Sequence, residues 1–198
     1  MLVLELEAFV WPKSISDDGE VLLFDSGVFP NRDVGILALD TDQEPEMLVA
    51  TAADESGGGF SPDGRFFVFN FNETAGFGVY AHEVASGSTF SVSTSSRGGA
   101  VARWSRDGTE IYYRPTDGTP GILVAEVTME PFSASDPVES SDIRVRRLTN
   151  FDVTADGQRF LVTTLPGSDI TDPATATPRI NVILNWFEEL KQRVPTGR

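Results

Sequence analysis

Few side chains in this 198-residue chain could carry acid–base, nucleophilic or metal chemistry. There is one histidine, His82, and there is no cysteine, so thiolate nucleophiles, thiolate metal sites and disulfides are excluded. A Ser–His–Asp triad would have to use His82, and the sequence contains no Gly-x-Ser-x-Gly nucleophile motif. His82 lies in a segment typical of a β-strand, where we expect it to have a structural role.

Carboxylates are the remaining candidates for a metal site. Asp18, Asp63, Asp107 and Asp156 each precede a glycine in a turn of the form small residue–x–Asp–Gly. Asp in such turns bonds to nearby backbone N–H groups, so we interpret these four as turn formers and not as a metal ring. No cofactor is predicted, but a divalent cation such as calcium stays open. Its candidate ligands are Asp54, Glu55, Asp152 and His82.

The Asp–Gly turns recur at a nearly constant spacing, and an apolar, β-prone run follows each of them. The pairs begin at positions 18, 63, 107 and 156, which gives steps of 45, 44 and 49 residues. Four short strands in a unit of roughly 45 residues are typical of a β-propeller blade. The sequence therefore predicts an all-β, single-domain propeller over residues 1–198, with about four four-stranded antiparallel blades. The predicted blades span residues 10–50, 57–93, 100–148 and 150–190.

The two ends of the chain complement one another. The last blade has predicted strands at 151–154, 158–164 and 180–184, then a helical turn at 185–193, and lacks a fourth strand of its own. The segment 2–9 is a predicted strand at the position that the fourth strand of a preceding blade would take. Exposed strand edges favour association. We therefore expect two chains to exchange this strand and form a closed, isologous homodimer.

The other predicted strands follow from the same pattern. Gly57, Gly58 and Gly59 are not followed by a helix, so a phosphate-binding loop is excluded and close backbone packing is expected at the start of an inner strand.

The predicted strands of the second blade are 59–61, 65–71, 77–84 and 89–93. Those of the third are 102–105, 110–114, 122–127 and 143–148, and the first blade has strands at 34–39 and 46–50.

Three motifs carry a family resemblance. F-S-P-D-G-R-x-x-x-F at 60–69, A-R-W-S-R-D-G-T-E-I-Y-Y at 102–113 and N-V-I-L-N-W-F-E-E-L-K at 181–191 resemble TolB-type, WD-repeat-like propeller repeats. The last motif is similar to the C-terminus of bacterial proteins in which such a propeller follows a serine/threonine kinase domain. The resemblance implies a bacterial chain that is the C-terminal part of a larger protein, or a reduced relative. The family is often periplasmic or extracytoplasmic; no signal peptide is expected, and localisation stays open.

Composition limits the partners. The chain has 30 acidic and 15 basic residues and a formal net charge of −15, so we do not expect it to bind nucleic acid. No apolar run approaches the roughly 18 residues that a membrane span requires.

Propeller geometry places the expected binding surface. Loops that lead into inner strands and loops that join second to third strands gather on one face, around the channel. We predict a non-catalytic interaction module there for a protein or small-molecule ligand, as the sensing part of a signalling protein. The alternative is a promiscuous metal-dependent hydrolase of the esterase, lactonase or phosphoesterase type, with a carboxylate-lined site in the channel. The candidate ligand-binding residues are Trp11, Lys13, Asp54, Glu55, Arg97, Arg103, Asn150 and Asp152.

Overall fold

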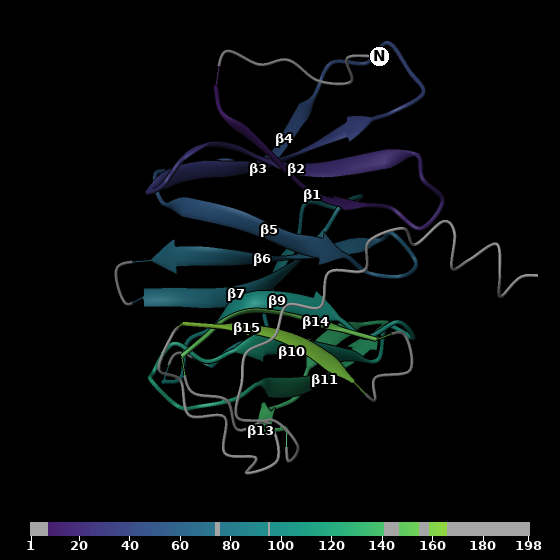
Figure 1. Ribbon diagram of the computed structural model, residues 1–198. Helices are drawn as coiled ribbons and strands as arrows, with labels where there is room; N and C mark the ends of the chain where they lie inside the picture. Colours follow the sequence, from purple (N-terminus) through teal and green to yellow (C-terminus); the bar gives the residue numbers. More distant parts are fainter. Residues whose placement is uncertain (1–7, 74–75, 95, 141–146, 155–158, 166–198) are drawn as a thin grey trace, which may run out of the picture.

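A computed structural model describes residues 8–73, 76–94, 96–140, 147–154 and 159–165. Within these ranges the chain consists of strands and turns that form antiparallel sheets, one after another along the sequence (Figure 1). This confirms the predicted all-β class. In this part of the chain, no helix has the length and apolar character needed to cross a membrane.

The first two sheets are four-stranded and keep the order of the sequence. The first contains β1 (Val10–Ile15), β2 (Val21–Val28), β3 (Asn31–Ala38) and β4 (Glu46–Val49). The second contains β5 (Asp54–Phe60), β6 (Phe66–Glu73), β7 (Gly76–Glu83) and β8 (Thr89–Ser91). β5 is longer than the predicted strand, so Asp54 and Glu55 lie in the strand and not in the loop before it.

The third sheet differs from the prediction at its outer edge. It contains β9 (Ala100–Trp104), β10 (Glu110–Arg114), β11 (Leu123–Met129), β12 (Phe132–Ala134) and β13 (Val138–Glu139). Both β12 and β13 pair with β11, at the position expected for the strand 143–148.

The reason for this difference is aromatic packing after a tight turn. The chain reverses after Met129, and the Phe132 ring then lies 4.9 Å from the ring centroids of both Phe66 and Phe90. Residues 143–146 lie outside the described ranges. Leu148 belongs to the next sheet, which contains β14 (Leu148–Val153) and β15 (Phe160–Thr164).

The Asp–Gly turns have the chemistry that the sequence predicts. In each described turn the Ser hydroxyl donates to the Asp carboxylate, at 2.5–2.7 Å, and that carboxylate accepts a backbone N–H two residues further on, at 3.0–3.1 Å. The glycine that follows has a φ of 72–78°. The hydrogen bond from the Ser hydroxyl lowers the pKa of Asp18 and of Asp107. The turn-forming role is confirmed for Asp18, Asp63 and Asp107, whereas Asp156 lies outside the described residues.

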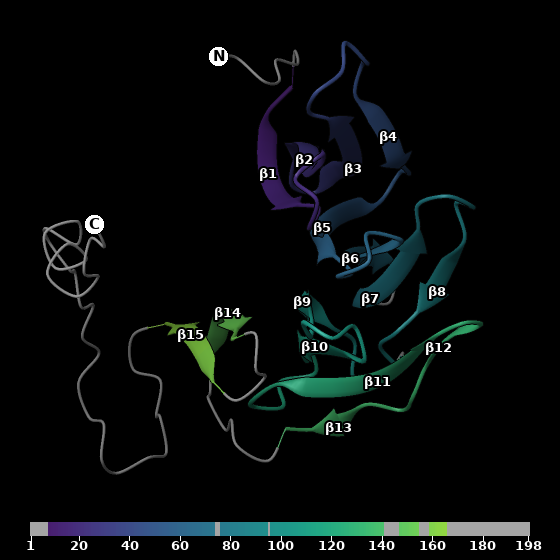
Figure 2. The same ribbon diagram turned by 90° about the vertical axis from the view of Figure 1, so that its right-hand side faces the viewer.

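The sheets are arranged as sectors around a common centre (Figure 2). The innermost strands are β1, β5, β9 and β14, and each contacts the next along this arc. The described residues do not form a closed ring. The predicted strand 180–184, the helical turn 185–193 and residues 2–7 lie outside them. The carbonyl oxygen of Phe9 accepts a hydrogen bond from Gly27 N–H at 2.8 Å, so this end of segment 2–9 extends the β1–β2 ladder.

Pairing of two chains into one ring stays a prediction. The expected result is a dimer mass in light scattering at micromolar concentration, because a partner would cover the two ends of the arc. A monomer under these conditions would contradict it.

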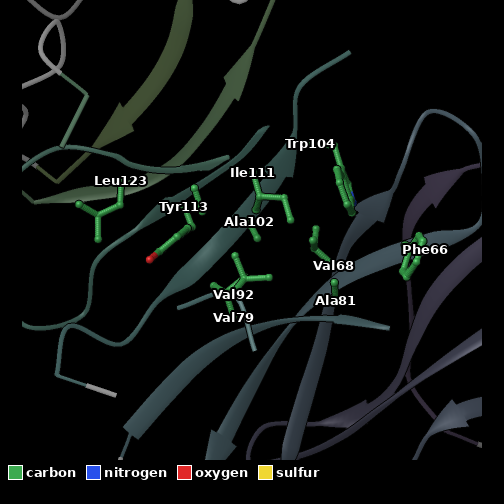
Figure 3. Packing of buried hydrophobic residues seen from close by; sticks show 11 residues of the cluster. Phe66, Val68, Val79, Ala81, Val92, Ala102, Trp104, Ile111, Tyr113 and Leu123 are labelled. Atoms are coloured by element: carbon green, nitrogen blue, oxygen red, sulfur yellow. The ribbon is translucent and has the colours of Figure 1, made fainter. Parts of the chain in front are cut away.

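The core lies between the sheets, and β6 shows why. Its apolar run is buried on both faces: Phe66 and Val68 point toward the third sheet, whereas Phe67 and Phe69 point toward the first. Successive strand residues point to opposite faces, so an uninterrupted apolar run is what a strand between two sheets requires. Figure 3 shows the cluster between the second and third sheets, where Val68, Val79 and Ala81 approach residues of β9 and β10.

Candidate functional site

All but one of the candidate residues lie on the inner strands of the sheets. Arg97 precedes β9. The others lie on the inner strands: Trp11 and Lys13 on β1, Asp54 and Glu55 on β5, Arg103 on β9, and Asn150 and Asp152 on β14.

Asp54 is held by an arginine of the first sheet. Arg32 on β3 donates to the Asp54 carboxylate from Nε at 2.9 Å and from Nη2 at 2.6 Å, and its backbone N–H donates at 3.1 Å. Only 1% of the Asp54 side chain is exposed. The hydrogen bond to Asp54 raises the pKa of Arg32. Asp54 therefore joins β5 to β3 in an internal ion pair.

Asp25 on β2 is the second buried carboxylate of this interface. Lys13 Nζ lies 3.0 Å from it, and it accepts hydrogen bonds from Ser56 Oγ at 2.7 Å and from Gly57 N–H at 2.8 Å. Its side chain is fully buried. We call Lys13, Asp25, Arg32 and Asp54 the ionic clamp. Of its members, Lys13 and Asp54 are candidate residues whose charges are neutralised within the protein.

Glu55 is buried without a cation in the described part of the chain. Its carboxylate accepts the Thr51 hydroxyl and, at 3.5 Å, the Thr51 N–H. Burial raises the pKa of Glu55, and the nearby carboxylates of Asp33 and Asp54 act in the same direction.

His82 belongs to the core of the second sheet. Its Nδ1 lies 2.9 Å from Thr89 Oγ1, and its ring packs 5.0 Å from the Phe67 ring and 6.5 Å from the Phe69 ring. Burial lowers the pKa of His82, which favours the neutral ring. The environment supports the structural role predicted for this residue.

The candidate metal ligands do not form a cation site. Among the described residues, no three His, Asp or Glu side chains are grouped so that they could hold a metal ion. Asp54 is bound to Arg32, and His82 contacts Thr89 inside its sheet. The donor set of Asp54, Glu55, Asp152 and His82 therefore does not fit a calcium ion.

Arg103, Asn150 and Asp152 lie close together on β9 and β14. The Arg103 guanidinium donates to the Ala102 carbonyl at 2.8 Å and to Asn150 Oδ1 at 3.4 Å, and its Nε lies 4.0 Å from Asp152 Oδ1. Burial lowers the pKa of Arg103, and the Asp152 charge opposes this shift. These contacts join β9 to β14.

Arg97 makes a similar link within the third blade. Its Nε lies 3.3 Å from Asp117 in the β10–β11 loop, and its Nη2 lies 3.1 Å from Glu139 on β13. Arg97 and Asp117 line a cavity of about 380 Å³, and Tyr80 contributes to the same wall.

Trp11 belongs to a group of exposed aromatic residues. Phe9, Trp11 and Phe29, which we call the aromatic patch, are 68%, 54% and 62% exposed. Phe9 directly precedes β1 and its carbonyl oxygen continues the pairing with β2, so Phe9 and Trp11, two residues apart, lie on one face of the sheet. Phe29 lies in the β2–β3 hairpin, and the Arg32 guanidinium lies 5.8 Å from the centre of its ring.

Sequence reasoning identified Trp11 but missed the clamp partners and the other aromatic residues. Asp25 directly follows the apolar run 21–24. A carboxylate that continues a buried strand indicates a partner inside the protein, so Asp25 could have been identified from the sequence. Phe29 precedes Pro30 in a hairpin, where an aromatic residue cannot be assigned to the core from its type alone.

A further cavity lies at the other end of the inner strands from Trp11, where β1 ends at Ile15. Its volume is about 260 Å³, and Ile15, Phe60, Trp104 and Val153 contribute to its lining. Each of these residues directly precedes the Ser or Thr of an Asp–Gly turn. The sequence repeat therefore places four apolar side chains around one cavity at this end of the inner strands.

Comparison with known proteins supports the fold. No protein-family model matches the chain, and no curated protein matches it. It is similar to TolB from Acinetobacter baumannii, with 21% identity over 79% of this chain and 37% of that one, and a TM-score of 0.57. A protein described as TolB from Agrobacterium tumefaciens has 16% identity over 81% and 61% of the two chains, and a TM-score of 0.59.

A third solved structure is described as a 6-phosphogluconolactonase from Bacteroides uniformis. It has 21% identity over 77% of this chain and 47% of that one, with a TM-score of 0.52. The chain thus spans less than two thirds of each of these proteins. At such identities the likeness concerns the fold and not the activity. The fold of the chain is thus similar to that of the TolB β-propellers.

Proposed function

We propose that the chain is a non-catalytic β-propeller interaction module that binds a protein segment at the aromatic patch. We further propose that it serves as the sensing part of a larger bacterial signalling protein. The observation that carries the proposal is the exposure of Phe9, Trp11 and Phe29 at one end of the first sheet. Aromatic residues grouped on a surface mark contact sites, and Trp is enriched among the residues that dominate binding energy.

The surroundings of the patch favour this role. Arg32 contacts Phe29 and is itself fixed by Asp54, and the strand that carries Trp11 also carries Lys13, which binds Asp25. These contacts hold the strands that carry the aromatic side chains in place, which reduces the conformational entropy lost on binding. The net charge of −15 favours a partner segment that is apolar or basic.

Binding is expected to depend on the aromatic patch. A peptide library is selected on the full chain, and the affinities of the selected peptides are measured by fluorescence anisotropy. Trp11→Ala and Phe29→Ala are each expected to weaken binding about tenfold, because each removes an aromatic contact worth about 1.4 kcal/mol.

Ile15→Ala is the matched control. Ile15 is 57% exposed on the same strand, but it lies at the opposite end. Peptides that bind Trp11→Ala as tightly as the unchanged chain, or that respond equally to Ile15→Ala, would contradict the proposed surface.

The hydrolase alternative is tested separately. The lactonase description of one structural neighbour gives a reason to include lactones beside esters and phosphoesters. The non-catalytic proposal expects no turnover. Turnover that Asp152→Ala abolishes while the circular dichroism spectrum is unchanged would overturn it.

A further inference from the structure

Arg114 lines a cavity that the proposed interaction surface does not include. The residue ends β10, and the cavity, of about 430 Å³, lies between the following loop and the start of β14. This loop joins the second and third strands of its blade, and Leu148 begins the inner strand of the next. The cavity is therefore on the face where propeller geometry gathers the loops.

Arg114 lacks the neutralising partner that comparable arginines have. Arg32, Arg97 and Arg103 each have a carboxylate oxygen within 4.0 Å. Within the described ranges, no carboxylate forms an ion pair with Arg114, and its Nε is buried without a hydrogen-bond partner. Burial also lowers the pKa of Arg114. Asp117, in the adjoining loop, is engaged by Arg97.

The cavity lining suits an anion. Among the described residues, its wall has no Asp or Glu, although the chain carries twice as many acidic as basic residues. A second arginine, Arg147, lines it, as do Thr116 and Thr119, which carry hydroxyl donors. Apolar surface is present as well. It comes from Pro115, Pro120 and Leu148.

We propose that this cavity binds a small organic anion, whose carboxylate or phosphate group is held by the Arg114 guanidinium. A half-buried guanidinium without an anionic partner among the described residues is costly, and an oxyanion that accepts from its Nη groups compensates part of that cost. The guanidinium fork matches both carboxylate and phosphate oxygens. The volume is within the range of small-molecule sites, and the apolar wall has room for a compact body attached to the anionic group.

Ligand binding is tested on the unchanged chain with inorganic phosphate, phenyl phosphate and benzoate. Each is added at millimolar concentration and compared with sodium chloride at equal ionic strength. Phenyl phosphate or benzoate is expected to raise the Tm by a few degrees, because a ligand that binds the folded state stabilises it. In NMR spectra, the Nε–H signal of Arg114 is expected to shift as the probe is added. The two organic probes distinguish a phosphate site from a carboxylate site.

Arg114→Met is expected to fold, because it leaves no acidic group unpaired, and to weaken binding of the organic probe by at least about tenfold. Arg65→Met is the control: it also removes one positive charge, but Arg65 is 42% exposed and does not line the cavity, so the response is expected to be kept. A Tm response no larger than that of sodium chloride would overturn the proposal, as would a response that survives in Arg114→Met. If Arg114→Met fails to fold, the titration of the Nε–H signal in the unchanged chain decides. The absence of a shift in that signal would overturn the proposal.

Discussion

Replacement of Arg32 by methionine is expected to lower the free energy of unfolding by about 3–5 kcal/mol. The substitution removes the guanidinium that binds Asp54 through two nitrogens, and Asp54 is 1% exposed. A carboxylate left buried without its partner keeps its desolvation cost and loses the compensating attraction. Urea denaturation at neutral pH measures the change as a shift of the midpoint at constant slope.

The double variant Arg32→Met/Asp54→Leu separates the pair from the packing around it. It is expected to recover much of the lost stability, because neither charge is then buried alone. Arg65→Met is the surface control: Arg65 is 42% exposed and pairs with Glu83, so little change is expected. A cost for Arg32→Met as small as that for Arg65→Met would show that Asp54 is solvated.

Replacement of Gly58 by alanine is expected to lower the free energy of unfolding by about 1–3 kcal/mol. An added Cβ would lie 2.7 Å from the carbonyl oxygen of Ala102 and 3.1 Å from Val68 Cγ2. The Ala102 oxygen belongs to the backbone of β9, so relief requires β5 and β9 to move apart. Gly58 is also the extra residue where the β5–β6 register shifts, between Gly57 and Gly59.

Gly59→Ala is the matched control, one residue away on the same strand. The nearest atom to its added Cβ is Ser14 Oγ at 3.6 Å, an ordinary contact. The substitution is expected to be neutral or to stabilise the fold slightly, because alanine restricts the unfolded chain. Equal destabilisation by the two substitutions, measured by thermal unfolding, would contradict the close approach of β5 to β9.

Much of the blade pattern could be predicted because its causes are local. Phe66–Phe69 are apolar at every position, which is what a strand covered on both faces requires. The Ser and Asp side chains of each described turn bond within a few residues of themselves. The glycine run 57–59 was correctly predicted to allow close backbone packing, although β5 begins five residues before the predicted strand 59–61.

The site was predicted less well because its contacts span sheets. The sequence predicted only that Arg103 and Asp152 belong to one face around the channel, and the 4.0 Å approach of the two side chains depends on how β9 and β14 pack. The partner of Asp54 could not be predicted from the sequence, because Arg32 is 22 residues away on another sheet. The outer edge of the third blade was also missed, because β12 is held there by contacts of Phe132 with Phe66 and Phe90.

By itself, the sequence determined the repeat, the turns and the all-β class, since these depend on interactions among residues close together along the chain. The tertiary structure alone decided which charges are neutralised and which are not. It pairs Lys13 with Asp25 and Asp54 with Arg32 inside the protein. It leaves Trp11 exposed and, among the described residues, leaves the buried Nε of Arg114 without a hydrogen-bond partner. The physical reason is that the energy of a charge depends on burial and on partners brought from distant strands, and neither is encoded in residue type or spacing.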